Sequence, residues 1–447
     1  MSGLAHDLRT VARFSDRDDQ ITRLAWSPAH VEAMRWMVGE ATALGLDAGI
    51  DAAGNVVARW GPATGPALAV GSHLDSVPDA GRLDGVLGVL AALAAVRRLQ
   101  AQGFTPRRPV WVIAFMDEEG ARFGTPLFGS RAFVGEDLEP SLAAVDADGV
   151  SIADAMRKAG FTPDRLGDAC AIDRVGAYLE LHIEQGPVLE KAGADIGVVR
   201  AISGGAVLAV GFTGHAGHAG TVPMDMRRDA LVGGARAIVA LRDAALGGGD
   251  LRITVGRIAA HPGGTNVIPG GCELSVDIRS ADPDALDRGR DVVGRIVERI
   301  ASEEGLQGSV RTLTEFAPLQ LDETIIATVA RAAAAESAVA LDVVSGAGHD
   351  ALVIGRAVPA GMIFVPSRNG ISHHPEEATS ADQCELGERV LARAIRALAG
   401  QDTNGGEIDE RRDSGGQAGR AAFRPPAGSR VHRGAVGPGD GAAGAAG

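Results

Sequence analysis

The fold of this 447-residue chain is organised around Gly71-Ser-His-Leu-Asp-Ser-Val77 and the short run Gly81-Arg-Leu-Asp-Gly85 that follows it. Residues 67–70 are apolar, which predicts a buried strand whose end opens into a loop. His73 and Asp75 lie two residues apart and therefore point the same way in an extended segment. One of them can hold a metal ion while the other fixes the tautomer of a nearby imidazole. At the exit of a buried strand this favours a metal site in an α/β protein, although the same residues are common in turns and caps.

Two further apolar runs lead into residues of the same chemical kind. Residues 109–115 read as a strand covered on both faces, and Glu118 and Glu119 follow it. Adjacent carboxylates repel each other and need a positive partner, so we expect one to bind metal and the other to act as a base. A solvated acidic turn is the alternative. Residues 361–366 form the other run, which leads to His373.

Residues 177–190 alternate apolar and polar positions, which predicts a strand with His182 on one face. A single His in such a strand is commonly a structural residue. Here it completes a set of three His and two carboxylates that suits two divalent ions sharing one carboxylate. Zn or Mn fits such a mixed set, and Co or Ni also does. The set is His73, Asp84, Glu119, His182 and His373.

Length and composition limit the class of protein. A chain of 447 residues exceeds one ordinary core and suggests two domains plus extra segments. The net charge of −14 argues against a nucleic-acid or anionic-membrane partner. No apolar run approaches the roughly 20 residues that span a membrane, and the first residues lack a signal-peptide core, so we expect a cytoplasmic location.

The order of predicted elements divides the chain. Residues 1–207 and 322–400 predict an α/β catalytic domain, with a mixed, mostly parallel sheet flanked by helices and a largely helical start over residues 4–50. Residues 208–321 follow a β-α-β-β-α order, typical of an inserted two-layer α+β domain with an antiparallel sheet. Residues 401–447 are rich in Gly, Ala, Arg and Pro and predict a disordered tail.

Taken together, these motifs resemble the amidase/hydantoinase-carbamoylase branch of the M20 family of di-metal peptidases, over about residues 10–400. That branch includes allantoate amidohydrolases, N-carbamoyl-L-amino-acid hydrolases and β-ureidopropionases. The run His182-Ile-Glu-Gln-Gly-Pro-Val-Leu-Glu190 is the most specific to it, because the peptidase branches usually carry a carboxylate in place of His182. The other matching motifs are Gly-Ser-His73-Leu-Asp75-Ser-Val, Asp84-Gly, Glu118-Glu119-Gly-Ala-Arg-Phe, Gly-His218-Ala-Gly-Thr-Val-Pro-Met, Gly-Gly-Thr-Asn266-Val-Ile-Pro-Gly and Ser-His373-His-Pro-Glu-Glu.

The resemblance implies a role for each metal-site residue. Asp75 would orient His73, and Glu118 would be the general base that takes a proton from a water bridging the two ions. The resulting hydroxide would attack a ureido carbonyl, and the carbamate product would break down to CO2 and ammonia. The implied ligands are His73 and His182 on one ion, Glu119 and His373 on the other, and Asp84 between them.

The same resemblance gives the inserted domain two roles, as a lid and as a dimerisation surface of a homodimer. His218 would stabilise the oxyanion in the active site of the partner subunit, although the local sequence alone favours a turn residue. Asn266 and Arg279 would bind the substrate, with Arg279 holding its carboxylate by two hydrogen bonds. On sequence alone, Arg279 reads as a solvated strand residue. Gln185 and His349 are further substrate-contact candidates; His215 and His374 receive no role.

The sequence therefore predicts a metal-dependent amidohydrolase acting on a linear ureido acid, either allantoate or an N-carbamoyl-L-amino acid. An aminoacylase or dipeptidase of the same family is one competing function, and His182 with its neighbours argues against it. A non-catalytic dimeric binding protein is a second, and the intact Glu118 argues against that.

Overall fold

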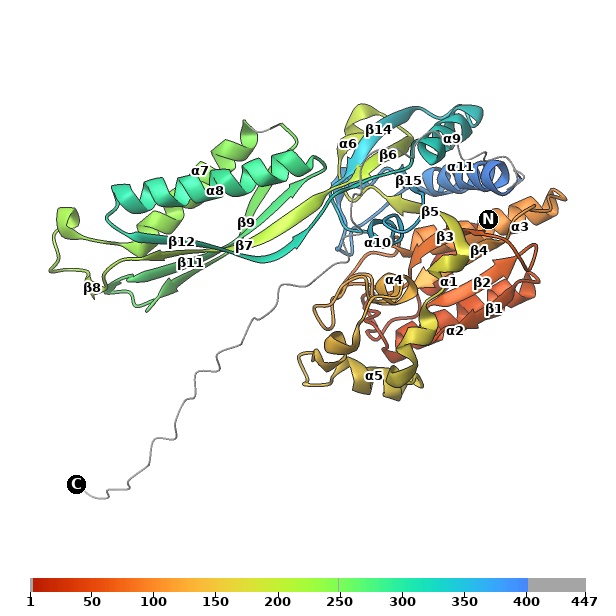
Figure 1. Cartoon of the computed structure of the whole chain (residues 1–447), viewed down its shortest axis with the longest axis horizontal. Helices are drawn as coiled ribbons and strands as arrows, with labels where there is room; N and C mark the ends of the chain where they lie inside the picture. Colours follow the sequence, from red (N-terminus) through yellow and green to blue (C-terminus); the bar gives the residue numbers. More distant parts are fainter. Residues whose placement is uncertain (1–2, 248, 401–447) are drawn as a thin grey trace, which may run out of the picture. The chain divides into compact units, whose positions relative to one another are not determined.

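The larger sheet of the protein carries four parallel strands at its centre (Figure 1). The structure is a computed structural model that describes residues 3–247 and 249–400. The strand order is β1-β2-β4-β3-β5-β15-β6-β13, with β14 pairing β6. The four parallel strands are β4 (Val110–Phe115), β3 (Ala67–His73), β5 (Val175–Ile183) and β15 (Ala360–Val365). The outer strands are β1 (Asp47–Ile50), β2 (Val56–Trp60), β6 (Ile196–Ile202), β13 (Leu319–Gln320) and β14 (Ala340–Ser345), and among their pairings only β14 with β6 is parallel.

The apolar runs form the central strands because helices cover the sheet. Every residue of β3, β4 and β15 is buried. Gly71 permits the close approach of β3 and β4, since a Cβ there would lie 1.8 Å from the Ile113 carbonyl oxygen. The helices around this sheet include α1 (Gly3–Val11), α2 (Pro28–Ala43), α3 (Val86–Ala101), α4 (Phe128–Phe133), α5 (Ile152–Ala159), α6 (Val188–Ala192), α9 (Glu323–Ala335), α10 (Asp350–Ile354) and α11 (Ala381–Ala399). The predicted α/β class is confirmed.

A second sheet has its own hydrophobic core. Its order is β12-β7-β11-β9, and all its pairings are antiparallel. Leu208, Val210 and Phe212 alternate with less buried residues and face two helices that lie side by side (Figure 1). A short ribbon pairs β8 (Gly217–His218) with β10 (Val267–Ile268). The elements are β7 (Gly204–Thr213), α7 (Ala230–Leu246), β9 (Arg252–His261), β11 (Gly271–Ser280), α8 (Pro283–Glu303) and β12 (Gln307–Phe316).

Three strands depart from the sequence-based expectation. The prediction of a helical start was wrong at residues 47–50, which form β1. β12 was missed because residues 307–315 are all exposed, so the strand shows no alternating burial pattern. β14 was also missed; it begins at Ala340, shortly after α9 ends at Ala335. The predicted tail lies outside the described residues. Among the described helices, none is long and apolar enough to cross a membrane.

Candidate metal centre

The five predicted ligands come together at the carboxyl ends of the parallel strands. His73 ends β3 and His182 lies next to the last residue of β5. Glu119 follows β4, and His373 follows β15. In a parallel sheet these strand ends share one edge, which is why residues far apart in sequence meet there.

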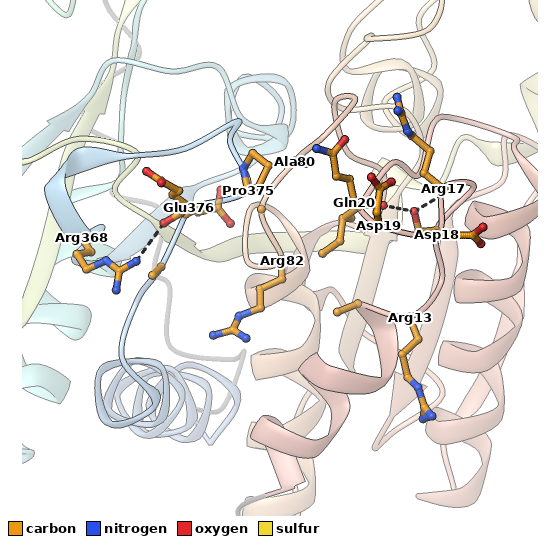
Figure 2. Close-up of a pocket in the computed structure, with 16 residues that line it drawn as sticks. Arg13, Arg17, Asp18, Asp19, Gln20, Ala80, Arg82, Arg368, Pro375 and Glu376 are labelled. Carbon is orange, nitrogen blue, oxygen red and sulfur yellow. Dashed lines mark hydrogen bonds between the residues drawn. The ribbon is translucent and has the colours of Figure 1, made fainter.

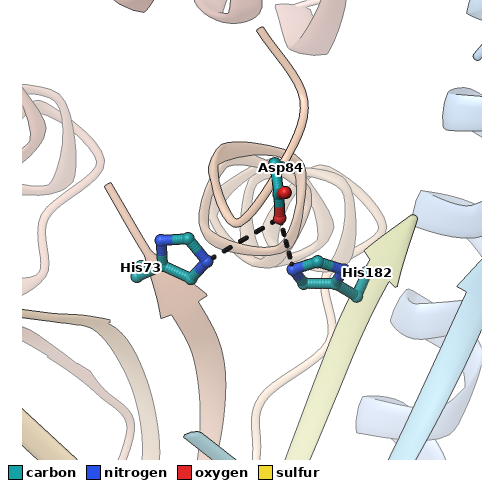
Figure 3. A group of neighbouring side chains, drawn as sticks. All are labelled: His73, Asp84 and His182. Carbon is teal, nitrogen blue, oxygen red and sulfur yellow. Dashed lines mark ion pairs between the residues drawn. The ribbon is translucent and has the colours of Figure 1, made fainter. Parts of the chain in front are cut away.

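Asp84 lies between two imidazoles, as Figure 3 shows. Its Oδ1 is 3.1 Å from His182 Nε2 and 3.9 Å from His73 Nε2, and all three side chains are buried. His182 places Nδ1 2.9 Å from the Ile183 carbonyl, so Nδ1 carries a hydrogen and, in the neutral ring, Nε2 presents a lone pair. The Gly85 N–H, 3.2 Å away, donates to Nε2. A lone pair facing a carboxylate is repulsive unless a cation or a proton lies between them.

A second group uses the other oxygen of Asp84. His373 Nε2 lies 3.2 Å from Asp84 Oδ2 and 3.3 Å from Glu119 Oε2. Glu119 Oε1 is buried and has no hydrogen-bond partner among the described residues. His373 is about half exposed and adopts a φ of 54°, an uncommon conformation for a residue with a side chain.

These distances fit metal coordination. Ligand bonds of about 2.0–2.2 Å to a four-coordinate ion place neighbouring ligand atoms roughly 3.3–3.5 Å apart. The observed separations of 3.1–3.9 Å span that value. In each group the three ligand atoms lie within 4.8 Å of one another. The residues therefore suit two cations with Asp84 in common, and a third group of His73, Glu118 and Glu119 meets the same distance limit.

The charges of the cluster shift its pKa values strongly. Burial alone would raise the pKa of Asp84, but hydrogen bonds to His182 and His373 hold it well below its usual range. Burial likewise would lower the pKa of His73, and the Glu118 charge and Asp75 raise it well above its usual range. Burial, reinforced by the Glu119 charge and opposed by His73, raises the pKa of Glu118 well above its ordinary value.

Asp75 anchors both residues of the acidic pair, Glu118 and Glu119. Its two carboxylate oxygens accept the backbone N–H groups of Glu118 at 3.3 Å and Glu119 at 3.2 Å. Its Oδ1 lies 3.6 Å from His73 Nδ1, whereas its backbone carbonyl lies closer, at 3.2 Å. Asp75 thus links the imidazole to the loop after β4, and its carbonyl accepts from the His73 ring.

Two of the substrate-contact candidates lie beside the cluster. Gln185 donates from Nε2 to Asp84 Oδ2 at 2.9 Å, so its amide already has a partner within the cluster. His349 is buried, with its ring 4.6 Å from the His182 ring and its Nε2 2.7 Å from the Ser345 hydroxyl.

The structure does not join the other three candidates to the cluster. Among the described residues, no hydrogen bond or ion pair connects His218, Asn266 or Arg279 to the predicted ligands. His218 is exposed, and its Nδ1 accepts the Gly220 N–H at 3.0 Å. The Arg279 guanidinium binds the Asp277 carboxylate at 2.8 and 3.0 Å, so it would need to change partners to bind a substrate.

Glu180 is a buried residue that the sequence analysis missed. It accepts hydrogen bonds from the Ser72 hydroxyl at 2.8 Å and from the Ala351 N–H at 3.0 Å. These contacts connect the strand of His182 to the segments that carry His73 and His349. The available signal was its spacing, because it lies two residues before His182 in the same strand.

Asp350 was also missed. It is fully buried, and neither carboxylate oxygen accepts a hydrogen bond among the described residues. Burial and the Glu180 charge raise the pKa of Asp350 well above its usual range, and the His73 charge opposes this shift. The Ser130 hydroxyl donates to the Leu127 carbonyl at 3.2 Å.

A cavity of about 680 Å³ is lined by residues from three segments of the chain, 12–21, 80–82 and 368–378 (Figure 2). Gly81 and Glu377 line it, whereas none of the five predicted ligands does. Its charged lining balances Arg13, Arg17, Arg82 and Arg368 against Asp18, Asp19, Glu376 and Glu377. This balance gives no preference for an anionic or a cationic ligand.

Metal uptake at His373 should depend on pH. Hydrogen bonds to Asp84 and then to Glu119 raise the pKa of His373 to about 10, so Nε2 holds a proton at neutral pH in the metal-free protein. A cation must displace that proton, and its affinity should therefore rise about tenfold per pH unit from pH 6 to 9. Calorimetric titration with Mn²⁺ in two buffers of different ionisation enthalpy measures the protons released. A pH-independent affinity for both ions would contradict this expectation.

Comparisons with known proteins identify the family of this chain. The model of peptidase family M20/M25/M40 matches residues 69–397. An N-carbamoyl-L-amino-acid amidohydrolase from Paenarthrobacter aurescens is 38% identical over 405 residues, 88% of this chain and 96% of that protein. A ureidoglycolate hydrolase from Oryza sativa subsp. japonica is 38% identical over 408 residues, 89% of this chain and 84% of that protein.

A solved structure extends the agreement to the fold. The crystal structure of an amidase of the hydantoinase/carbamoylase family from Burkholderia multivorans has a TM-score of 0.83 and 33% identity, covering 89% of this chain and 97% of that chain. The resemblance inferred from the motifs is thereby confirmed. The chain belongs to the M20/M25/M40 peptidase family.

Proposed function

We propose that this chain is a metal-dependent amidohydrolase that cleaves the ureido C–N bond of a linear carbamoyl compound, allantoate or an N-carbamoyl-L-amino acid. One observation carries the proposal: Asp84 lies together with two separate pairs of potential ligand side chains, and Glu118 lies directly beside this cluster. Two relatives, an N-carbamoyl-L-amino-acid amidohydrolase and a ureidoglycolate hydrolase, support hydrolysis as the class of reaction. Ammonia and CO2 would be the products that leave the substrate.

Each residue of the cluster would have a defined task. His73 and His182 would hold one divalent ion, Glu119 and His373 the other, and Asp84 both. The ions, Zn or Mn with Co or Ni as further options, would supply Lewis acidity when bound. Glu118 would take the proton of the attacking water and pass it to the leaving nitrogen. Burial raises the pKa of Glu118, which favours a residue that must both take and return a proton.

Substrate recognition would involve the second sheet. Arg279 would bind the substrate carboxylate in place of Asp277, with Asn266 beside it. His218 would act on the developing oxyanion in the active site of the partner subunit, so we propose a homodimer that works in the cytoplasm. Gln185 and His349 would contact the substrate from the cluster side.

The substrate is the least constrained part of the proposal. The Oryza sativa relative is as similar as the Paenarthrobacter aurescens one, which makes ureidoglycolate a second candidate. An aminoacylase or dipeptidase activity and a non-catalytic binding role are the competing functions.

Ammonia release by the metal-loaded protein tests the proposal. Allantoate, ureidoglycolate, N-carbamoyl-β-alanine and several N-carbamoyl-L-amino acids would be offered separately, with an N-acetyl amino acid and a dipeptide as controls. We expect turnover of allantoate or an N-carbamoyl-L-amino acid, and none of the controls. Cleavage of a control without any ureido turnover would contradict the reaction class. Two bound ions with no turnover at all would favour the binding protein.

A further inference from the structure

Glu377 is a buried carboxylate that contacts both loops of the second ligand group. It lies four residues after His373 and is 4% exposed. Its Oε1 accepts the backbone N–H groups of Leu83 at 2.8 Å and Asp84 at 3.2 Å. Its Oε2 lies 3.0 Å from the Ser372 hydroxyl. Among the described residues, no cation forms an ion pair with Glu377; its carboxylate accepts two backbone N–H groups and lies beside the Ser372 hydroxyl, whose one hydrogen can be donated to Glu377 or to Asp84.

Ser372 completes the connection to the shared ligand. Its hydroxyl lies 2.8 Å from Asp84 Oδ2, the oxygen that faces His373. Glu377 therefore holds Asp84 at its backbone, while Ser372 joins Gln185 in contacting its Oδ2. The two loops are almost 300 residues apart in sequence, so these contacts fix one loop against the other.

The packing around the Glu377 carboxylate is tight. A Cβ at Gly81 would lie 2.2 Å from Glu377 Oε1, so the backbone at residues 81–84 closes directly around this oxygen. On the other side, the Glu377 N–H donates to the His374 carbonyl at 3.0 Å and closes the turn that follows His373. His373 has the uncommon φ of 54°, and such a backbone conformation persists only where its surroundings hold it.

We infer that Glu377 and Ser372 are a positioning pair that sets the distance between Asp84 and His373 and so allows Asp84 to serve two metal ions. The inference rests on the proposed metal centre. Burial of a carboxylate without a cation costs folding free energy. The hydrogen bonds to both loops account for an acid at this position.

Metal binding to four variants tests the pair. Co²⁺ would be titrated into metal-free protein, with the stoichiometry from calorimetry and the ligand environment from the visible absorption spectrum. We expect Glu377→Ala to weaken one of the two equivalents by about 10- to 100-fold and to change its spectrum, because partners that orient ligands commonly have effects of this size. Ser372→Ala should weaken the same equivalent by a smaller factor. Glu377→Gln should recover part of the affinity, since its amide oxygen still accepts from residues 83 and 84.

Glu376→Gln is the matched control, because the adjacent Glu376 is exposed and its backbone carbonyl, not its carboxylate, accepts from Arg368. We expect it to bind both ions as the wild type does. Wild-type affinity for both ions in Glu377→Ala would overturn the inference alone. A Glu377→Ala protein with disrupted secondary structure, together with wild-type binding by Ser372→Ala, would also overturn it in favour of a structural role. Fewer than two ions in the wild type would overturn the metal centre and this inference together.

Discussion

Glu118→Gln is expected to lower kcat by roughly 10²- to 10⁴-fold while the protein still binds two divalent ions, because the amide keeps the shape of the side chain but cannot accept a proton. Glu118 Oε2 lies 3.6 Å from His73 Nε2, beside the ligands without belonging to the two groups that share Asp84. Ammonia release gives the rate, and elemental analysis of the purified variant gives the number of ions per subunit.

The neighbouring residue provides the matched control. Glu119 Oε2 lies 3.3 Å from His373 Nε2, so Glu119→Gln should lose an ion as well as activity. The comparison of these two variants is needed because Glu118 could itself be a metal ligand, together with His73 and Glu119. If Glu118→Gln loses an ion just as Glu119→Gln does, Glu118 is a ligand and a different base must be found. A variant with near wild-type kcat would exclude Glu118 from proton transfer.

The sequence was informative wherever burial and chain direction determine the structure. The runs that became β3, β4 and β15 are apolar because helices cover the sheet, and this pattern can be recognised without coordinates. Since parallel strands end at one edge, polar residues after each run were expected to meet there. His73 and Glu119 illustrate this rule, because each follows or ends such a run and both lie within the cluster.

Contacts between loops were beyond the reach of this reasoning. Nothing in the sequence pairs Glu377 with the N–H groups of residues 83 and 84, because any buried acid can accept from any nearby backbone. Exposure hid β12 for a related reason: residues 307–315 of this edge strand are all exposed, so the strand needs no apolar alternation. Arg279 shows a third limit: the family resemblance implied that it binds a substrate carboxylate, but it could not show that the guanidinium already pairs with Asp277.

The sharing of Asp84 leads to the other large effect. Asp84→Ala is expected to weaken the binding of both metal ions. We expect it to reduce turnover by about 10⁴-fold or more, which is at least as large a loss as that expected for Glu118→Gln. Each oxygen of Asp84 serves a different group: Oδ1 lies 3.1 Å from His182 Nε2, and Oδ2 lies 3.2 Å from His373 Nε2. Titration of the metal-free variant with Co²⁺ measures both affinities, and ammonia release measures the rate.

Comparison with His373→Ala distinguishes a ligand that both ions share from a ligand of one ion. This substitution removes a metal ligand from only one of the two groups that share Asp84. We therefore expect the variant to keep one ion with wild-type affinity. Asp84→Ala should keep neither, although its loss of side-chain volume is no greater. If both variants lose a single ion and retain the other equally well, Asp84 belongs to one group alone. The 3.1 Å contact with His182 would then be a hydrogen bond of the metal-free protein, because a protonated imidazole beside a buried carboxylate gives the same distance as two ligands of one ion.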